Sequence, residues 1–98
     1  MADLLSTADI NTHLAELDGW SGDTGGITRT AKLPTFVAAI GVVDRVATVA
    51  EEMDHHPDID VRWRTLTFVC ATHSAGGVTI KDIDLARRID EILASTSG

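Results

Sequence analysis

Apolar residues recur every three or four positions in three stretches of the chain, which is the spacing of one helix face. The first stretch follows the Ser6 N-cap and ends before Gly19, and the third begins after Thr79 and continues to Leu93. The second stretch is the longest and opens at Pro34, a residue that suits the first turn of a helix. The apolar stripe that we expect to pack this second helix on a sheet consists of Phe36, Ile40, Val43, Ala47 and Ala50, and is widened by Val37, Val46 and Met53.

Alternating apolar and polar residues predict strands between these helices. A hairpin is expected around the glycine-rich residues 21–26, with its longer strand ending at Leu33. Residues 59–63 alternate in the same way and residues 66–72 are rich in β-forming side chains, so two more strands are predicted, with a tight join around Arg64-Thr65. The order helix, strand, strand, helix, strand, strand, helix predicts one α+β domain over residues 1–98, with a four-stranded antiparallel sheet covered by helices on one face.

Size and charge narrow the possible functions. A chain of 98 residues with 44% hydrophobic residues has room for one compact core and for no second domain. Fifteen acidic residues against eight basic ones give a formal charge of −7, which disfavours direct binding of nucleic acid because such binders carry a basic face. A core this small gains stability from self-association, so we expect a homodimer or homotetramer. Gly41, inside the longest helix, suggests the close approach of another backbone at such an interface.

Two further features bear on where the protein works. Cys70 is the lone cysteine and lies in an apolar run, so we expect a buried small side chain and no internal disulfide. Asp3 stands where a signal peptide would carry basic residues, and no apolar run approaches the ~18–20 residues needed to span a bilayer. We therefore expect a cytoplasmic protein that does not contact membranes.

Three of the four histidines lie between residues 55 and 73 and are flanked by carboxylates. They are His55, His56 and His73, with Glu51 before them and Asp82 after a Gly-Gly turn. Because Glu51 and His55 are four residues apart near the end of the long helix, we expect this carboxylate to orient the His55 ring. The proline that follows His56 keeps that residue out of the helix, so the two adjacent rings should point in different directions.

This cluster fits three kinds of site. Imidazole, with an unperturbed pKa of ~6.5, exchanges protons near neutral pH, so acid/base catalysis without a metal is favoured. A metal site is the second interpretation, which is weakened because adjacent histidines seldom both reach one ion and no His-Glu-x-x-His motif is present. The third interpretation is structural, with the histidines at helix ends or in solvent and with Asp82 as a helix-capping carboxylate.

One extended motif joins these residues. It begins with Glu51-x-x-x-His55-His56-Pro57 and continues through Trp63, Thr72-His73 and Asp82, and Gly19-Trp20 precedes it at the end of the first helix. In this pattern the chain resembles the pterin-4a-carbinolamine dehydratases, and the resemblance extends over nearly the whole sequence.

The resemblance implies an enzyme that removes water from 4a-hydroxytetrahydropterin to give quinonoid dihydropterin in pterin recycling. It implies no metal and no organic cofactor, and assembly as a dimer or tetramer. The catalytic residues that it implies are His55, His56 and His73. The supporting or substrate-binding residues that it implies are Glu51, Asp54, Asp82 and Trp20, the last of these beside the pterin.

Several alternatives stay open on the sequence. A pterin-binding or protein-interaction module would keep the same residues without turnover, and a dehydratase of this kind would also fit another pterin pathway. The sequence does not assign which histidine acts as the acid and which as the base.

Overall fold

The structure, a computed structural model, describes residues 3–96 of the chain. Its helices are α1 (Thr7–Leu14), α2 (Phe36–Met53) and α3 (Ile80–Thr96), and a short 3-10 turn, η1 (His73–Ala75), precedes α3. Its strands are β1 (Trp20–Asp23), β2 (Gly26–Lys32), β3 (Asp58–Arg62) and β4 (Thr65–Cys70). The order of helices and strands is the predicted one, with η1 as an addition.

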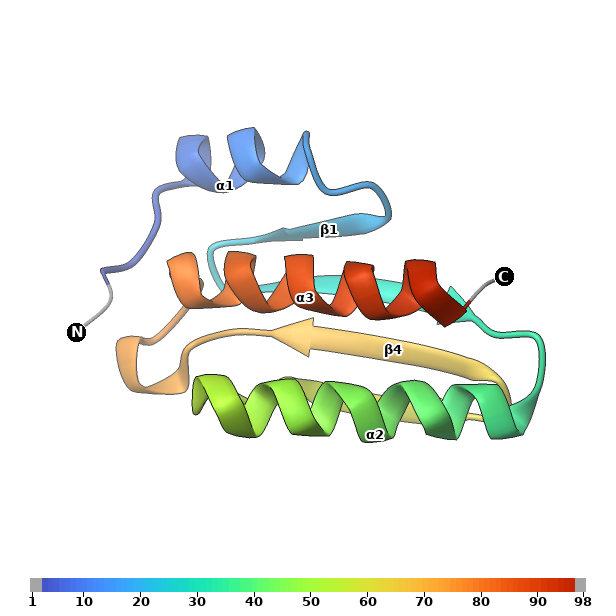
Figure 1. The fold of residues 1–98 in the computed structure, drawn as a ribbon. Coiled ribbons are helices and arrows are strands. Elements are labelled where there is room, and N and C mark those ends of the chain that lie inside the picture. Colours follow the sequence, from blue (N-terminus) through green and yellow to red (C-terminus); the bar gives the residue numbers. More distant parts are fainter. Residues whose placement is uncertain (1–2, 97–98) are drawn as a thin grey trace.

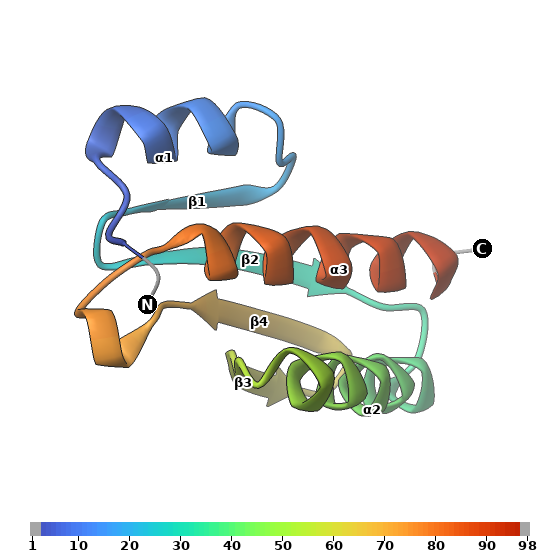
Figure 2. The same ribbon diagram turned by 60° about the vertical axis from the view of Figure 1, so that its left-hand side comes forward.

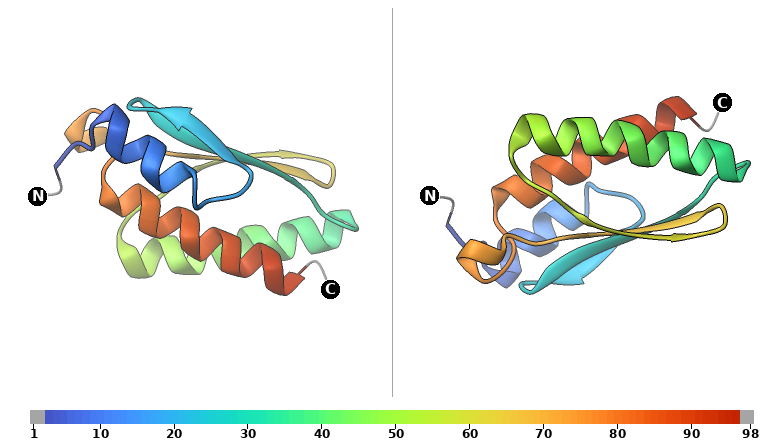
Figure 3. Two further views of the ribbon diagram at one scale, coloured as in Figure 1. Left: turned by 90° about the horizontal axis from the view of Figure 1, so that it is seen from above. Right: turned by 90° about the horizontal axis from the view of Figure 1, so that it is seen from below.

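The four strands form one antiparallel sheet in the order β1-β2-β4-β3. The helices lie on one side of this sheet, as the views in Figures 1, 2 and 3 show. α1 packs beside β1, and α2 and α3 run next to each other over the remaining strands. The prediction of a single α+β domain with a four-stranded antiparallel sheet is confirmed.

The core lies between the sheet and the two long helices. Along β4 the side chains of Leu66, Phe68 and Cys70 are fully buried, and those between them are only half-buried. Val46 from α2 and Ile89 from α3 are also fully buried. The alternation along β4 is the period of a strand with one face on the core. In the stretch 3–96, no helix is long and apolar enough to cross a bilayer.

The start and the buried face of α2 differ from the predicted ones. Pro34 is predicted in the first turn, but the helix begins at Phe36 after the N-cap Thr35, whose hydroxyl oxygen accepts a hydrogen bond from the Ala38 N–H at 3.0 Å. Of the predicted stripe, Phe36, Ile40 and Ala47 are exposed. The residues that α2 buries are Ala39, Val42, Val46, Val49 and Ala50. Because most positions between 36 and 50 are apolar, helical periodicity alone did not distinguish the two faces.

β3 and β4 are joined by Trp63 and Arg64, one residue earlier than predicted. Trp63 has a φ angle of 54°, a left-handed conformation that is uncommon for a bulky residue. The Arg64 guanidinium lies 4.6 Å from the centre of the Trp63 ring. The tight turn was difficult to place from sequence because it contains no glycine, asparagine or aspartate.

The C-terminal end of α2 and the N-terminal end of α3 meet at one end of the sheet. The chain leaves α2 there towards β3, and β4 brings η1 and the start of α3 to the same end, at the left of Figure 1. A hydrogen bond between His55 and Asp82 joins the two segments. The fold therefore brings together the segments 51–56 and 72–82, which carry most of the predicted site residues.

Candidate functional site at the ends of two helices

The end of α2 sends its two adjacent histidines in different directions. The helix ends at Met53, and Asp54 takes the left-handed conformation, with φ 49° and ψ 44°. The Asp54 N–H still donates to the Ala50 and Glu51 carbonyls, so this residue closes the helix. Beyond it, His55 is buried, with 8% of its surface exposed, whereas His56 is exposed. The Asp54 side chain is exposed, and its backbone ends the helix. A supporting role for this side chain stays a prediction.

His55 is bonded to a carboxylate from α3. Its Nε2 lies 2.5 Å from Asp82 Oδ1, and the Asp82 side chain is fully buried. A buried carboxylate needs partners because it has lost its water. Asp82 has three: the His55 ring, the Thr72 hydroxyl at 2.8 Å and the Thr79 N–H at 2.9 Å. The pair is thus held by hydrogen bonds on both carboxylate oxygens.

Asp82 has two roles that the sequence presented as alternatives. It stands three residues after Thr79, and by accepting the Thr79 N–H it satisfies one of the unpaired donors at the start of α3. The same oxygen accepts the Thr72 hydroxyl, and the other oxygen faces His55. The hydrogen bond from the Thr79 N–H holds the Asp82 carboxylate in place, and this carboxylate in turn holds the His55 ring.

Glu51 is bonded to His56, and not to His55 as the sequence analysis predicts. Glu51 Oε2 and His56 Nε2 form a short contact between two exposed side chains. The predicted i,i+4 pair required His55 to continue the helix. The left-handed Asp54 ends it one residue earlier and turns the His55 ring towards α3, so that Glu51 meets the next residue instead.

His55 and His56 face their carboxylates with the same ring nitrogen. An ionised carboxylate only accepts hydrogen bonds, so the imidazole nitrogen that faces it donates. In His55 and in His56 that nitrogen is Nε2. A proton on Nε2 satisfies such a carboxylate and leaves Nδ1 as the nitrogen that can accept a proton elsewhere.

His73 is the first residue of η1 and is exposed. Its position depends on Thr72, whose carbonyl accepts the N–H groups of Ala75, Gly76 and Gly77 at 3.0–3.3 Å. Thr72 also bonds Asp82, so His73 follows directly after a residue that is tied to the His55 pair. The spacing Thr79-x-x-Asp82 predicts the capping contact at the start of α3, which the structure contains. The sequence assigned no role to the Thr72 hydroxyl.

Trp20 is not brought to the histidines. It is 6% exposed, and its Nε1–H donates to Asp90 Oδ1 at 2.8 Å. Arg29 Nη1 lies 2.5 Å from the same oxygen. Asp90 follows Asp82 by eight residues on one helix, which is about 12 Å along its axis. Trp20 is therefore a core residue that anchors the Arg29–Asp90 pair, and its place beside the pterin stays a prediction.

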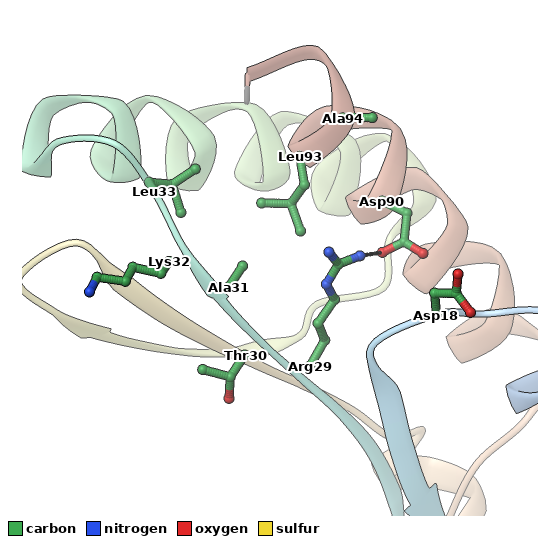
Figure 4. Close-up of a pocket in the computed structure, with 9 residues that line it drawn as sticks. All are labelled: Asp18, Arg29, Thr30, Ala31, Lys32, Leu33, Asp90, Leu93 and Ala94. Carbon is green, nitrogen blue, oxygen red and sulfur yellow. Dashed lines mark hydrogen bonds and ion pairs between the residues drawn. The ribbon is translucent and has the colours of Figure 1, made fainter. Parts of the chain in front are cut away.

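A hollow of about 510 Å³ lies at this other end of α3. Arg29, Asp90, Leu33 and Leu93 are among the residues that line it, and the ion pair stands at one wall (Figure 4). Its volume is within the range of small-molecule sites, roughly 300–1,000 Å³. None of the three predicted catalytic histidines lines it, so the hollow and the histidine group are separate features.

The Cys70 thiol, which interacts with the charge of Asp82, is a buried core group. Burial, and then the charges of Asp82 and Asp58, raise the pKa of the Cys70 thiol from 9.0 to about 12. This thiol is therefore protonated and unreactive at neutral pH. Across residues 3–96, no three His, Cys, Asp or Glu side chains are grouped as metal ligands would be.

Comparison with known proteins decides the family. The model of the family described as "Pterin 4 alpha carbinolamine dehydratase" matches residues 3–92. The chain belongs to this family. Among named relatives of this dehydratase family, a provisionally named pterin-4-alpha-carbinolamine dehydratase of Nocardia farcinica is 56% identical over 90 residues, covering 92% of this chain and 95% of its own. One of Roseiflexus castenholzii, also provisionally named, is 50% identical and covers 95% of this chain and 100% of its own.

Solved structures of pterin dehydratase type share the fold. The crystal structure of a transcriptional coactivator/pterin dehydratase from Brucella melitensis superposes with a TM-score of 0.89 at 35% identity, covering 98% of this chain and 100% of that one. A pterin dehydratase-like protein that is a RuBisCO assembly factor in the alpha-carboxysome gives 0.62 at 16% identity, covering 74% and 84%. At that identity the second likeness concerns the fold alone.

Proposed function

We propose that the protein dehydrates a pterin-4a-carbinolamine to the quinonoid dihydropterin by histidine acid/base catalysis, as a step of cytoplasmic tetrahydropterin recycling. The observation that carries the proposal is the His55–Asp82 pair, in which a buried carboxylate holds one ring nitrogen at 2.5 Å. His56 follows His55 directly in the chain, and His73 follows Thr72, whose hydroxyl bonds Asp82; both of these histidines are exposed. Family membership supplies the substrate class.

The reaction needs two proton transfers. The C4a–O bond breaks with its electron pair going to oxygen, an acid delivers a proton to that oxygen, and a base removes the proton from N5. The products are one water molecule and the quinonoid ring, so atoms and charge balance without an oxidant or reductant. Imidazole can serve in either role near pH 7, and each such transfer contributes roughly 10²–10⁴-fold.

The carboxylates orient the rings for this chemistry. With its Nε2–H donated to Asp82, His55 has Nδ1 available to the substrate, and the negative charge of Asp82 stabilises the protonated ring. Glu51 acts on His56 in the same manner but in solvent, where the interaction is weaker. We expect His55 to be the more strictly positioned of the two, with Glu51 and Asp54 near the substrate.

The direct test follows the absorbance of freshly generated carbinolamine at fixed pH. Wild-type protein should accelerate its dehydration, and a His55→Ala, His56→Ala double variant should lose the acceleration. His13→Ala is the matched control, because His13 lies on α1 and is outside the motif. Equal rates for wild type and double variant would refute the enzymatic proposal. Stoichiometric zinc in the purified protein, measured by elemental analysis, would refute the metal-free mechanism.

A binding or interaction role is the second candidate. The Brucella melitensis relative is described as a transcriptional coactivator as well as a pterin dehydratase, which favours keeping this role in view. A module of this kind would bind pterin without accelerating its dehydration. Calorimetry with a stable dihydropterin, run beside the rate assay, separates the two, because binding without turnover would support the module.

We also propose that the protein is a homo-oligomer that associates through α2. Phe36, Val37 and Ile40 are 49%, 81% and 37% exposed, which is unusual for an apolar helix face. A Cβ placed on Gly41 would meet nothing within 4 Å, so this side of the helix is open to another backbone. Light scattering should give at least a dimer, and a Val37→Asp variant should give a smaller mass. A wild-type mass equal to one chain would overturn this proposal.

A further inference from the structure

Thr72 contacts the Asp82 carboxylate, which holds His55, and it also belongs to the turn that carries His73. Its hydroxyl lies 2.8 Å from Asp82 Oδ2 and 2.8 Å from the Thr79 hydroxyl. Its backbone pairs with Gly77, through the Thr72 N–H to the Gly77 carbonyl at 2.9 Å. Its side chain is buried, so the hydroxyl has protein partners in place of water. One residue thus ties the turn that carries His73 to the carboxylate that holds His55.

The hydroxyl protons in this group can point in only one direction. An ionised carboxylate accepts, so Thr72 must donate its single proton to Asp82. The Thr72 oxygen then accepts the proton of the Thr79 hydroxyl. The Thr79 oxygen in turn accepts the Lys81 N–H at 3.3 Å. Each of the two hydroxyls thus both donates and accepts a hydrogen bond. Hydrogen bonds linked in this way strengthen one another when they are buried.

The effect of the chain is to hold the Asp82 carboxylate in one rotamer. Oδ2 is fixed by the Thr72 hydroxyl and the Thr79 N–H, which leaves Oδ1 directed at His55 Nε2. A partner of this kind behind a carboxylate–histidine pair sets the ring's tautomer and orientation. Burial, and then the charges of Asp82 and of Asp58 on β3, raise the pKa of the Cys70 thiol to about 12, so this thiol remains neutral.

We propose that Thr72 is a positioning residue for His55. Its hydroxyl holds Asp82 in the rotamer that keeps the His55 proton on Nε2 and frees Nδ1 for the substrate. The catalytic consequence rests on the proposed dehydratase function, whereas the tautomer is a property of the folded protein alone. Loss of the hydroxyl leaves Oδ2 with the Thr79 N–H as its remaining partner among these groups and leaves the Thr79 hydroxyl without its acceptor.

The test compares Thr72→Val, which keeps the shape and loses the hydroxyl, with Thr72→Ser, which keeps the hydroxyl. Long-range ¹H–¹⁵N spectra of the histidine rings show which nitrogen is protonated. Wild type and T72S should show the Nε2–H form of His55, and T72V should show a mixture with Nδ1–H. In the rate assay, T72V should lower kcat roughly 10–100-fold, as loss of an outer partner commonly does, with KM within about twofold.

Thr67→Val is the matched control. It removes a comparable bond between threonine hydroxyls, Thr67 to Thr30 at 3.1 Å, from residues with no hydrogen bond to Asp82. It should leave the His55 signals and kcat unchanged. An Nδ1–H form in the wild type would overturn the proposal even if T72V did not fold. Equal losses in T72V and T72S, or unchanged tautomer in folded T72V, would also overturn it. Absence of turnover in the wild type would refute the dehydratase function and leave the tautomer result valid.

Discussion

His55 Nε2 and Asp82 Oδ1 lie 2.5 Å apart although 27 residues separate them in the chain. The ring comes from the segment that follows α2 and the carboxylate from the first turn of α3. Both are buried, so the contact is protected from competing water. Exact placement of an imidazole in this way is what a proton-transfer role requires.

Asp82→Asn should reduce kcat by roughly 10²–10⁴-fold, because an amide can donate to the His55 ring and stabilise the wrong tautomer. Stability should also fall, by about 1–3 kcal/mol, since the buried hydrogen bonds to Asp82 are perturbed. Asp84→Asn on the exposed side of α3 is the control and should change neither quantity by much. Wild-type kcat in D82N would show that the pair is not catalytic.

Glu51→Gln should have a smaller effect than Asp82→Asn. The Glu51–His56 pair is exposed, and exposed pairs contribute about 0–1 kcal/mol to stability. We expect an unchanged urea midpoint and a loss of kcat of less than about tenfold. The difference between the two proteins should be smaller at high salt, where the wild-type pair is screened. Glu52→Gln, at the neighbouring exposed position, is the comparison. A greater loss in E51Q than in D82N would reverse the proposed ranking of the two histidines.

Cys70 should be inert in the folded protein. Burial raises the pKa of its thiol to about 12, so the thiolate is scarce at pH 8. A disulfide reagent such as Ellman's should label it only after unfolding in urea. Since the unfolded thiol ionises near 9.0 and the folded one near 12, the contribution of Cys70 to stability should be complete below pH 9 and should be lost as the pH rises from 9 towards 12. Rapid labelling of the native protein at pH 8 would contradict the burial.

The two faces of α2 should respond differently to the same substitution. Val46→Ala removes buried methyl groups and should destabilise the fold by about 1.5–3 kcal/mol. Val37→Ala, at 81% exposure, should leave unfolding of the single chain within about 0.5 kcal/mol of wild type and weaken association instead. Urea unfolding at several protein concentrations distinguishes the effects. A larger loss for Val37 would restore the stripe predicted from sequence.

Trp20→Phe should leave KM within about twofold of wild type. The indole is buried against Asp90, about two turns of α3 from Asp82, so its loss should act on packing. The Nε1–H bond contributes about 0.5–1.5 kcal/mol, or somewhat more because its acceptor is charged. The melting temperature should therefore fall. A large rise in KM with an unchanged melting temperature would favour the predicted place of Trp20 beside the pterin.

The sequence was sufficient for the fold and insufficient for the pairing within the site. The hydrophobic period predicted the three helices and the four strands, because each of them has its own local signal, but it placed the turn between β3 and β4 one residue late and missed η1. The partner of His55 depends on a single backbone conformation at Asp54, which no pattern in the sequence announces. The buried face of α2 also depends on tertiary packing, since both faces are apolar. The capping pattern predicts Thr79 as a partner of Asp82. The bond from the Thr72 hydroxyl depends on the buried position of Asp82 in the folded protein.

The long separation between His55 and its carboxylate has a consequence during synthesis. Once the chain has been synthesised through α2 and the four strands, His55 is present, but its partner Asp82, on α3, is not. A product truncated before residue 82 would retain all three motif histidines and lack the group that holds the first of them. The proposed site is therefore complete only after the chain has been synthesised as far as Asp82 in α3.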